Sequence, residues 1–137
     1  MEFEIKEFFK WKDEYRVGIA QIDEQHKNLF DLVNRLYSAF SAKKTENDLD
    51  DVFSDLFAYT IKHFTEEEAL LEQSNYENLK DHKQKHNEFI DKLKVFHRDA
   101  GTKKLAITYQ LMSLTRSWLL DHIMYEDQLY REILIKD

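Results

Sequence analysis

The chain is almost free of the residues that interrupt helices. Its 137 residues include no proline and only two glycines, Gly18 and Gly101. Parallel sheets and tight hairpins normally carry more turn residues than this. The sequence therefore predicts an all-α fold of long helices joined by short polar connections.

Apolar residues recur at steps of three and four, the period that turns one face of an α-helix towards a core. Four such stretches predict an up-down-up-down antiparallel four-helix bundle, with helices at about 21–40, 48–73, 76–99 and 102–127. With this many helices in 137 residues, we expect one domain covering residues 1–137.

The segments between and around these helices are polar or irregular. Ser74-Asn75 predicts a short break, and the connection near Gly101 combines a helix-ending glycine with Thr102 as an N-cap. Residues 1–20 are apolar without a clean period, which suggests an N-terminal arm packed across the bundle. Residues 128–137 are expected to form a C-terminal extension.

Composition excludes several classes of function. Lys plus Arg number 20 against 27 for Asp plus Glu, a net charge of -7, which disfavours nucleic acid and anionic membrane surfaces as partners. The absence of cysteine excludes disulfides, thiol chemistry, Fe–S clusters and cysteinyl zinc sites. No apolar run approaches the length of a membrane span, and the N-terminus lacks a signal-peptide core. We therefore expect a cytoplasmic protein with no membrane insertion.

Five of the six histidines fall on the predicted apolar stripes: His26, His63, His82, His86 and His122. A single histidine there would most simply be a hydrogen-bonded core residue. Five are harder to explain in that way, because each buried imidazole needs a polar partner. A metal is the simplest partner that several neutral imidazoles can share.

Spacing along the helices supports a metal site. His63 and Glu67 are four residues apart, as are His82 and His86. Four residues turn a helix by about 400°, so the members of each pair point within roughly 40° of one another. Glu67 stands in a run of three glutamates, 66–68, and is the one with this offset from His63.

The fourth helix breaks this pattern. His122 and Asp127 are five residues apart, which places them about 140° apart on an ideal α-helix. Either the helix deviates locally, as in the π-bulges common at functional sites, or the carboxylate reaches around the helix.

All the candidate ligands should meet at one end of the bundle. In an up-down bundle the first and third helices begin at the end where the second and fourth finish. The candidates lie at these positions: His26, His63, Glu67, His82, His86, His122 and Asp127. His97 lies eleven residues after His86, about 16 Å further along the axis, so we assign it a structural or surface role.

Five imidazoles and two carboxylates are more donors than one reactive metal ion uses. Two ions bridged by the carboxylates fit the number better. A nitrogen and oxygen donor set without sulfur suits iron among the redox metals, and zinc and manganese remain chemical alternatives.

Four segments of the chain resemble the hemerythrin family, in the same order and at consistent spacing. They are residues 22–30, 63–67, 82–89 and 118–127. The resemblance implies that His82, His86 and His122 bind one iron. It implies that His26 and His63 bind the other, with an open position where dioxygen binds. Glu67 and Asp127 would bridge the two iron ions together with an oxo or hydroxo group.

Reversible oxygen binding also requires a pocket that excludes water. Four residues flank the ligands and are candidates to line it, besides their role in the core: Phe64, Trp118, Leu119 and Ile123. Tyr130 matches a family tyrosine near the site. Asp23 precedes the first ligand, and we interpret it as a helix N-cap rather than as an acceptor behind a ligand.

The function implied by the resemblance is reversible dioxygen binding for oxygen transport, storage or delivery, not enzymatic catalysis. An oxygen-consuming enzyme would be the recipient, and a monomer is expected. Because we expect a single domain with no further one fused to it, a sensory input domain is disfavoured. The alternatives are a di-iron enzyme (oxidase, peroxidase or nitric-oxide-reducing) and an iron-buffering protein.

Overall fold

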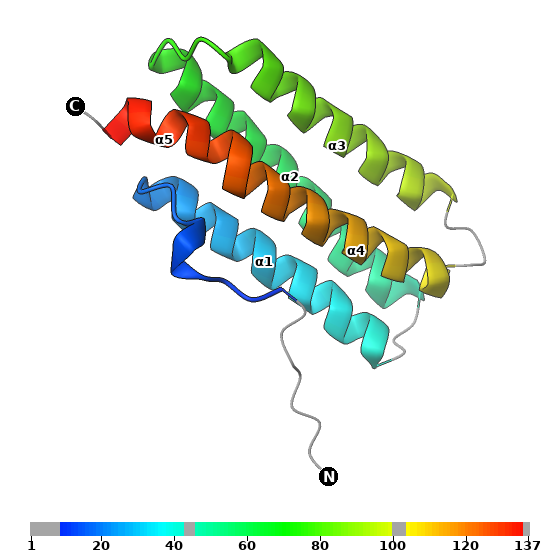
Figure 1. Ribbon diagram of the computed structural model, residues 1–137. Coiled ribbons are helices and arrows are strands. Elements are labelled where there is room, and N and C mark those ends of the chain that lie inside the picture. Colours follow the sequence, from blue (N-terminus) through cyan, green and yellow to red (C-terminus); the bar gives the residue numbers. More distant parts are fainter. Residues whose placement is uncertain (1–8, 43–45, 100–103, 136–137) are drawn as a thin grey trace.

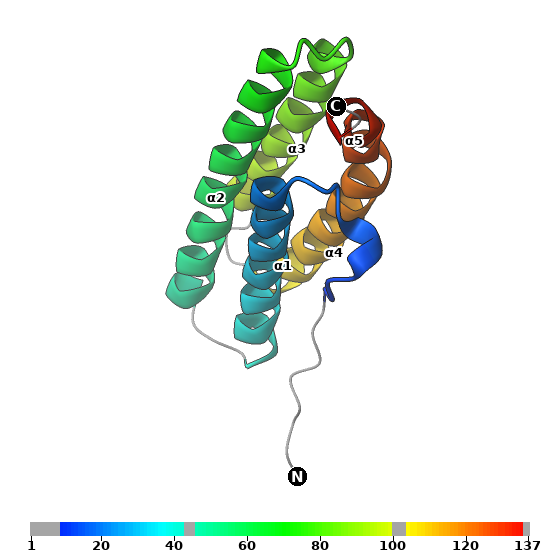
Figure 2. The ribbon, with the colours of Figure 1, turned by 90° about the vertical axis from the view of Figure 1, so that its left-hand side faces the viewer.

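The computed structural model describes residues 9–42, 46–99 and 104–135. The predicted all-α fold is confirmed, since every regular element in these ranges is helical. Four long helices lie side by side and alternate in direction (Figure 1, Figure 2). They are α1 (Ala20–Ser41), α2 (Glu46–Gln73), α3 (Leu79–Asp99) and α4 (Lys104–Asp121).

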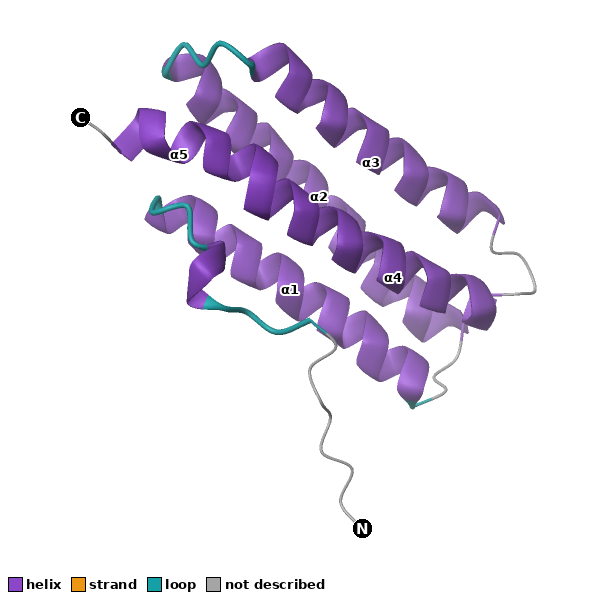
Figure 3. Cartoon of the chain, in the orientation of Figure 1, coloured by secondary structure: helices purple, strands orange, loops and turns teal. Residues whose placement is uncertain are grey.

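The fourth helix continues beyond its expected end. A π-helical segment, His122–Glu126, follows α4 and leads directly into α5 (Asp127–Ile135), so the chain stays helical to residue 135 (Figure 3). The expected C-terminal extension is therefore mostly helix. Tyr130 lies in this continuation, and its side chain is fully buried.

The turn between α2 and α3 delays the third helix to Leu79, three residues later than the sequence predicts. Asn75 adopts a left-handed conformation with φ 54°. The Tyr76 N–H donates to the carbonyl of Leu71 at 3.0 Å, and the Asn75 N–H donates to that of Glu72 at 3.1 Å. These bonds satisfy the last carbonyls of α2, and Tyr76 packs in one apolar cluster with Leu71. The predicted connection through Gly101 lies outside the described residues.

The described part of the N-terminal arm, from Phe9 onwards, lies across the bundle. The ring of Phe9 stacks on that of Phe30 in α1, with centroids 3.5 Å apart. The Phe9 N–H donates to Asn34 Oδ1 at 2.7 Å, and Asn34 Nδ2 donates back to the Phe9 carbonyl at 2.8 Å. Gln128 in α5 donates to the Arg16 carbonyl at 3.2 Å, so the arm contacts both the first and the last helix.

Asp23 does not cap α1, contrary to the prediction. The N-cap is Ile19, which offers no side-chain hydrogen bond, and Asp23 lies within the first turn. Its two carboxylate oxygens accept the N–H groups of Val17 at 2.7 Å and of Gly18 at 3.2 Å. Gly18 has φ 86°, and this left-handed turn lets both N–H groups face the helix. Asp23 therefore ties the arm to α1.

Two apolar clusters fill the interior. The larger runs along the bundle and takes residues from all four long helices, among them Leu29, Leu56, Leu93 and Met112. The smaller lies under the arm and the α2–α3 turn and consists of Val17, Ile22, Leu71, Tyr76 and Tyr130. No helix in the described part of the chain is long and apolar enough to cross a membrane.

Candidate metal centre

The structure brings all seven predicted ligands together at one end of the bundle. Each of them is at most 4 % exposed. α1 and α3 contribute residues near their starts, and α2 contributes residues near its end. The last two ligands come from the π-helical segment and from the first residue of α5. The seven are His26, His63, Glu67, His82, His86, His122 and Asp127.

Glu67 lies between two groups of histidines. Its Oε1 is 2.6 Å from His82 Nε2 and 3.1 Å from His86 Nε2. Its Oε2 is 3.3 Å from His63 Nε2 and 3.6 Å from His26 Nε2. One carboxylate therefore presents a separate oxygen to each group.

Asp127 repeats this division. Its Oδ1 is 3.2 Å from His82 Nε2 and 3.1 Å from His122 Nε2. Its Oδ2 is 3.2 Å from His26 Nε2. The cluster thus has a three-histidine side and a two-histidine side, and both carboxylates reach both sides.

The donor atoms fit a pair of metal ions. Neither oxygen of Asp127, nor His63 Nε2, receives a hydrogen bond of good geometry, although all three atoms are buried. The Nε2 atoms of His86 and His122 are only 2.9 Å apart. Ligands held about 2.1 Å from one ion at right angles lie about 3 Å apart. Since buried polar groups rarely lack partners, this arrangement fits metal ligation on both sides.

The electrostatics of the cluster also favour cations. Burial lowers the pKa of His63. Burial acts in the same direction on His26 and His82, but Asp127 and Glu67 outweigh it and raise these pKa values to about 9 and about 10. Burial would raise the pKa of Glu67 and Asp127, yet the surrounding imidazoles hold both below their usual range. Two buried carboxylates that stay anionic attract cations, and metal ions would displace the imidazole protons.

The π-helical segment explains how His122 and Asp127 share one face. The Asp127 N–H donates to the carbonyl of His122, five residues earlier, instead of four. This widened turn brings the Asp127 carboxylate back to within 3.1 Å of His122 Nε2. Of the two interpretations that the spacing left open, the local deviation of the helix is confirmed.

Two hydrogen bonds behind the ligands were missed by sequence reasoning. His63 Nδ1 lies 2.6 Å from Gln25 Oε1, and His86 Nδ1 lies 2.7 Å from Glu68 Oε2. Gln25 and Glu68 are each adjacent in sequence to a ligand. Neighbouring residues on a helix point about 100° apart, so helical spacing gives no sign that they belong to the same site.

Tyr130 completes the surroundings of Glu67. Its hydroxyl donates to Glu67 Oε2 at 3.2 Å. Burial and the charges of Asp127 and Glu67 raise the pKa of Tyr130 well above its ordinary value, so the hydroxyl stays protonated and remains a donor. Its assignment near the site followed from resemblance alone, and the structure supplies its contact.

Aromatic rings pack directly on ligands of the three-histidine side. The ring of Phe64 stacks on His86 with centroids 3.7 Å apart, and that of Trp118 stacks on His122 at 4.4 Å. Phe64 also lies 5.8 Å from the ring of His63. The two aliphatic residues expected in the oxygen pocket, Leu119 and Ile123, are buried in the same apolar cluster as Phe64.

The remaining candidates lie outside the cluster. Glu66 accepts hydrogen bonds from Gln21 at 3.3 Å and Gln25 at 3.2 Å instead of facing the ligands. His97 stacks on Phe53 at 4.6 Å towards the opposite end of the bundle, where its side chain is 48 % exposed. The expected structural or surface role of His97 agrees with this position.

Comparisons with known proteins agree with the helical fold. The family model described as the hemerythrin HHE cation binding domain matches residues 17–134. A bacteriohemerythrin of Clostridium acetobutylicum is 30 % identical over 126 residues, covering 89 % of this chain and 98 % of the relative. A myohemerythrin of Theromyzon tessulatum is 30 % identical over 131 residues, covering 96 % and 98 %. A solved structure of a single-residue mutant of hemerythrin superposes with a TM-score of 0.79 at 24 % identity, covering 94 % of this chain and 98 % of that one.

Proposed function

The chain belongs to the hemerythrin family, and from this we propose that it binds dioxygen reversibly at a di-iron centre, for oxygen transport, storage or delivery. The observation that carries the proposal is the unequal division of the histidines. Three imidazoles lie on one side of the shared carboxylates and two on the other. A metal on the two-histidine side has one protein ligand fewer, which leaves room for a small ligand.

Each residue has a role in this proposal. His82, His86 and His122 would hold one iron, His26 and His63 would hold the other, and the carboxylates of Glu67 and Asp127 would be shared between them together with an oxo or hydroxo group. When bound, a ferrous pair supplies the electrons that dioxygen binding requires. Histidine-rich ligation supports binding over oxygen activation, because carboxylate-rich di-iron bundles are more anionic and stabilise higher oxidation states better.

The apolar residues around the site would keep water away from the bound ligand. Phe64 is 4 % exposed, Leu119 2 % and Ile123 0 %. Together with the partly buried Trp118, whose ring stacks on His122 on the three-histidine side, these are the residues that we propose for the oxygen pocket. Exclusion of water and protons favours release of the ligand as dioxygen over its loss in reduced form.

The wider context of the protein is also part of the proposal. We expect the single domain to act as a monomer and to deliver oxygen to an oxygen-consuming enzyme. The names of the relatives, bacteriohemerythrin and myohemerythrin, support the binding function over a di-iron enzyme or an iron-buffering protein.

Reversibility is the property to test. The protein is loaded with ferrous iron without oxygen, and its iron content and visible spectrum are measured as oxygen is added and then removed under vacuum. We expect two irons per chain and a visible absorption band that appears with oxygen and disappears under vacuum. Irreversible oxidation to a stable ferric form would contradict the carrier function. Fewer than two irons per chain would contradict any di-iron function.

A further inference from the structure

Two ligand histidines on opposite sides of the carboxylates have different partners behind them. His86, on the three-histidine side, lies 2.7 Å through Nδ1 from a carboxylate oxygen of Glu68. His63, on the two-histidine side, lies 2.6 Å through Nδ1 from the amide oxygen of Gln25. Both rings are only 1 % exposed, and both turn Nε2 towards Glu67. The two positions match in geometry and differ in charge.

The proton positions follow from these contacts. Nε2 of each ring faces the cluster and must offer its lone pair to a metal, so Nδ1 carries the proton and donates it. Gln25 can accept only through its oxygen, and its Nε2 donates to Glu66 Oε2 at 3.2 Å. This second bond fixes which end of the amide faces His63.

A carboxylate and an amide affect an imidazole differently. A hydrogen bond from Nδ1–H to a carboxylate is charge-assisted and shifts electron density towards Nε2, and the negative charge itself stabilises a more positive metal nearby. The side chain of Glu68 is 23 % exposed, so water screens part of its charge, but the hydrogen bond stays direct. The amide of Gln25 is neutral and exerts the weaker effect.

We propose that Glu68 and Gln25 are positioning residues that set the two irons at different reduction potentials. Glu68 makes the three-histidine iron the easier one to oxidise. Gln25 holds His63 in the same ring orientation without adding charge, which keeps the two-histidine iron ferrous at higher potentials. This inference rests on the proposed di-iron function, and it identifies which of the two metals loses an electron first.

The central variant is Glu68→Gln, which retains an acceptor for His86 and removes the charge. Potentiometric titration of the iron-loaded protein measures its two one-electron steps. We expect one step to move to higher potential by about 59 mV, which is a tenfold lower ratio of oxidised to reduced metal at a fixed potential. Glu88→Gln is the matched control, because Glu88 is an exposed residue of α3, the helix that carries His86, and accepts a bond only from Gln84 among the described contacts. Equal shifts in the two variants, or no shift in either, would overturn the proposal.

The reciprocal variant moves the charge to the other side. Gln25→Glu combined with Glu66→Gln exchanges amide and carboxylate and leaves the net charge unchanged. The bond between the two side chains is kept with its direction reversed, because the amide at position 66 now donates to the carboxylate at position 25. We expect the potential of the two-histidine iron to fall, so that the two one-electron potentials lie closer together than in the unaltered protein. A purely structural role for Gln25 predicts reduced iron content with an unchanged separation of the potentials, and this result would overturn the proposal.

A measurement without iron redox chemistry tests the hydrogen bond itself. In the zinc-loaded protein, the His86 Nδ1 proton should resonate downfield and shift upfield in Glu68→Gln, with no change in Glu88→Gln. An unchanged resonance in both variants would contradict the assigned contact. If Glu68→Gln shifts the potential but the protein does not bind oxygen reversibly, the proposed function is refuted and this inference is supported. If oxygen binding is reversible but the potentials do not shift, the function stands and this inference is refuted.

Discussion

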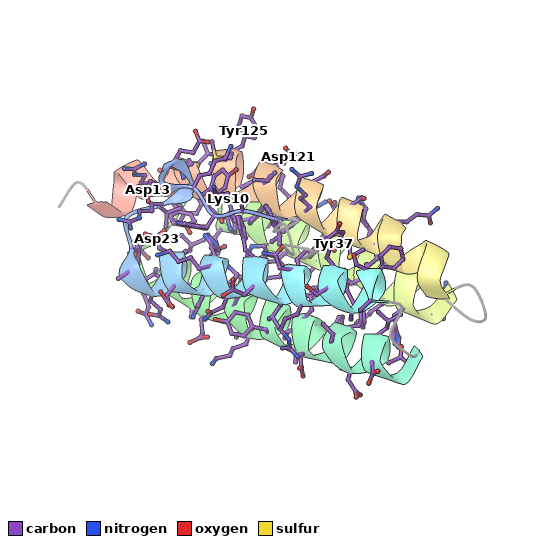
Figure 4. All side chains as sticks on the ribbon, turned by 90° about the horizontal axis from the view of Figure 1, so that it is seen from below. Lys10, Asp13, Asp23, Tyr37, Asp121 and Tyr125 are labelled. Atoms are coloured by element: carbon purple, nitrogen blue, oxygen red, sulfur yellow. The ribbon has the colours of Figure 1, made fainter. Side chains whose placement is uncertain are left out.

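Both ends of the bundle contain fully buried side chains, and the ligand end adds a polar cluster to its apolar ones. In Figure 4, Asp23 lies near the start of α1 at the ligand end, and Tyr37 lies near its other end. The ligand end contains five imidazoles and two carboxylates, whereas the opposite end is filled by residues such as Leu36, Leu49 and Leu93. Apolar side chains are stable through packing alone, whereas both Asp127 oxygens and His63 Nε2 are buried without a hydrogen-bond partner, which fits cation binding. The same bundle geometry therefore serves a core at one end and a binding site at the other.

Removal of a shared ligand should have the largest effect, and only at the ligand end. In Glu67→Ala both metals lose a donor, so iron per chain should fall well below two. Loss of a residue that only hydrogen-bonds to a ligand lowers metal affinity by roughly 10–100-fold, and loss of Glu67 should lower the affinity for iron by more than this. Iron analysis measures the loss, and circular dichroism should show that the helices persist. Glu72→Ala, at an exposed position of the same helix, is the control, and iron loss in it to the same degree would argue against Glu67 as the shared ligand.

The same substitution at each end separates packing from function. Leu93→Ala and Leu119→Ala each remove a buried leucine, and each should lower the free energy of unfolding by about 2–5 kcal/mol. Denaturant titration checks this effect. Both variants should retain two irons per chain, but only Leu119→Ala should speed autoxidation of the oxygenated protein. Faster autoxidation in Leu93→Ala as well would show that stability, and not the pocket, controls that rate.

Tyr130→Phe should have a smaller effect. It removes the hydroxyl that donates to Glu67 Oε2 and keeps the buried ring. Hydrogen bonds to charged groups contribute about 1.5–3 kcal/mol, so thermal or denaturant unfolding should show a loss in that range. Since the ligands themselves are unchanged, iron content should stay at two. An unchanged free energy of unfolding would indicate that the hydrogen bond to Glu67 is no more stable than the bond that the hydroxyl makes to water in the unfolded chain.

His97→Ala should have the smallest effect, although it also removes a histidine. His97 Nε2 lies 3.6 Å from Asp50 Oδ1 between partly exposed side chains, and surface contacts of this kind contribute about 0–1 kcal/mol. Iron content, oxygen binding and autoxidation should all match those of the unaltered protein. Any loss of iron in this variant would mean that the two ends of the bundle are coupled.

Much of the site could be predicted from particular residues in the sequence. The four-residue spacing of His63 and Glu67, and of His82 and His86, works because both pairs lie on regular α-helix. The five-residue spacing of His122 and Asp127 indicated a deviation from α-helical geometry but could not choose its form. Backbone hydrogen bonding resolves it, because the Asp127 N–H pairs with the His122 carbonyl.

Other features depended on contacts between segments far apart in the sequence. Gln25 and Glu68 reach histidines 38 and 18 residues away, across from one helix to another. Asp23 binds the arm and not the helix that it begins, because the turn at Gly18 directs two N–H groups towards it. No periodicity within a single helix contains this information.

The sequence by itself determined the helices and the end of the bundle at which the ligands meet. Helical period and the order of the elements are local or topological properties, and the scarcity of proline and glycine leaves few alternatives to long helices. Only the tertiary structure decided which histidines each carboxylate oxygen contacts. It also decided which side chains accept the Nδ1 hydrogen bonds of His63 and His86. Those features depend on side chains from different helices meeting within hydrogen-bond distance, and that proximity exists only once the bundle has packed.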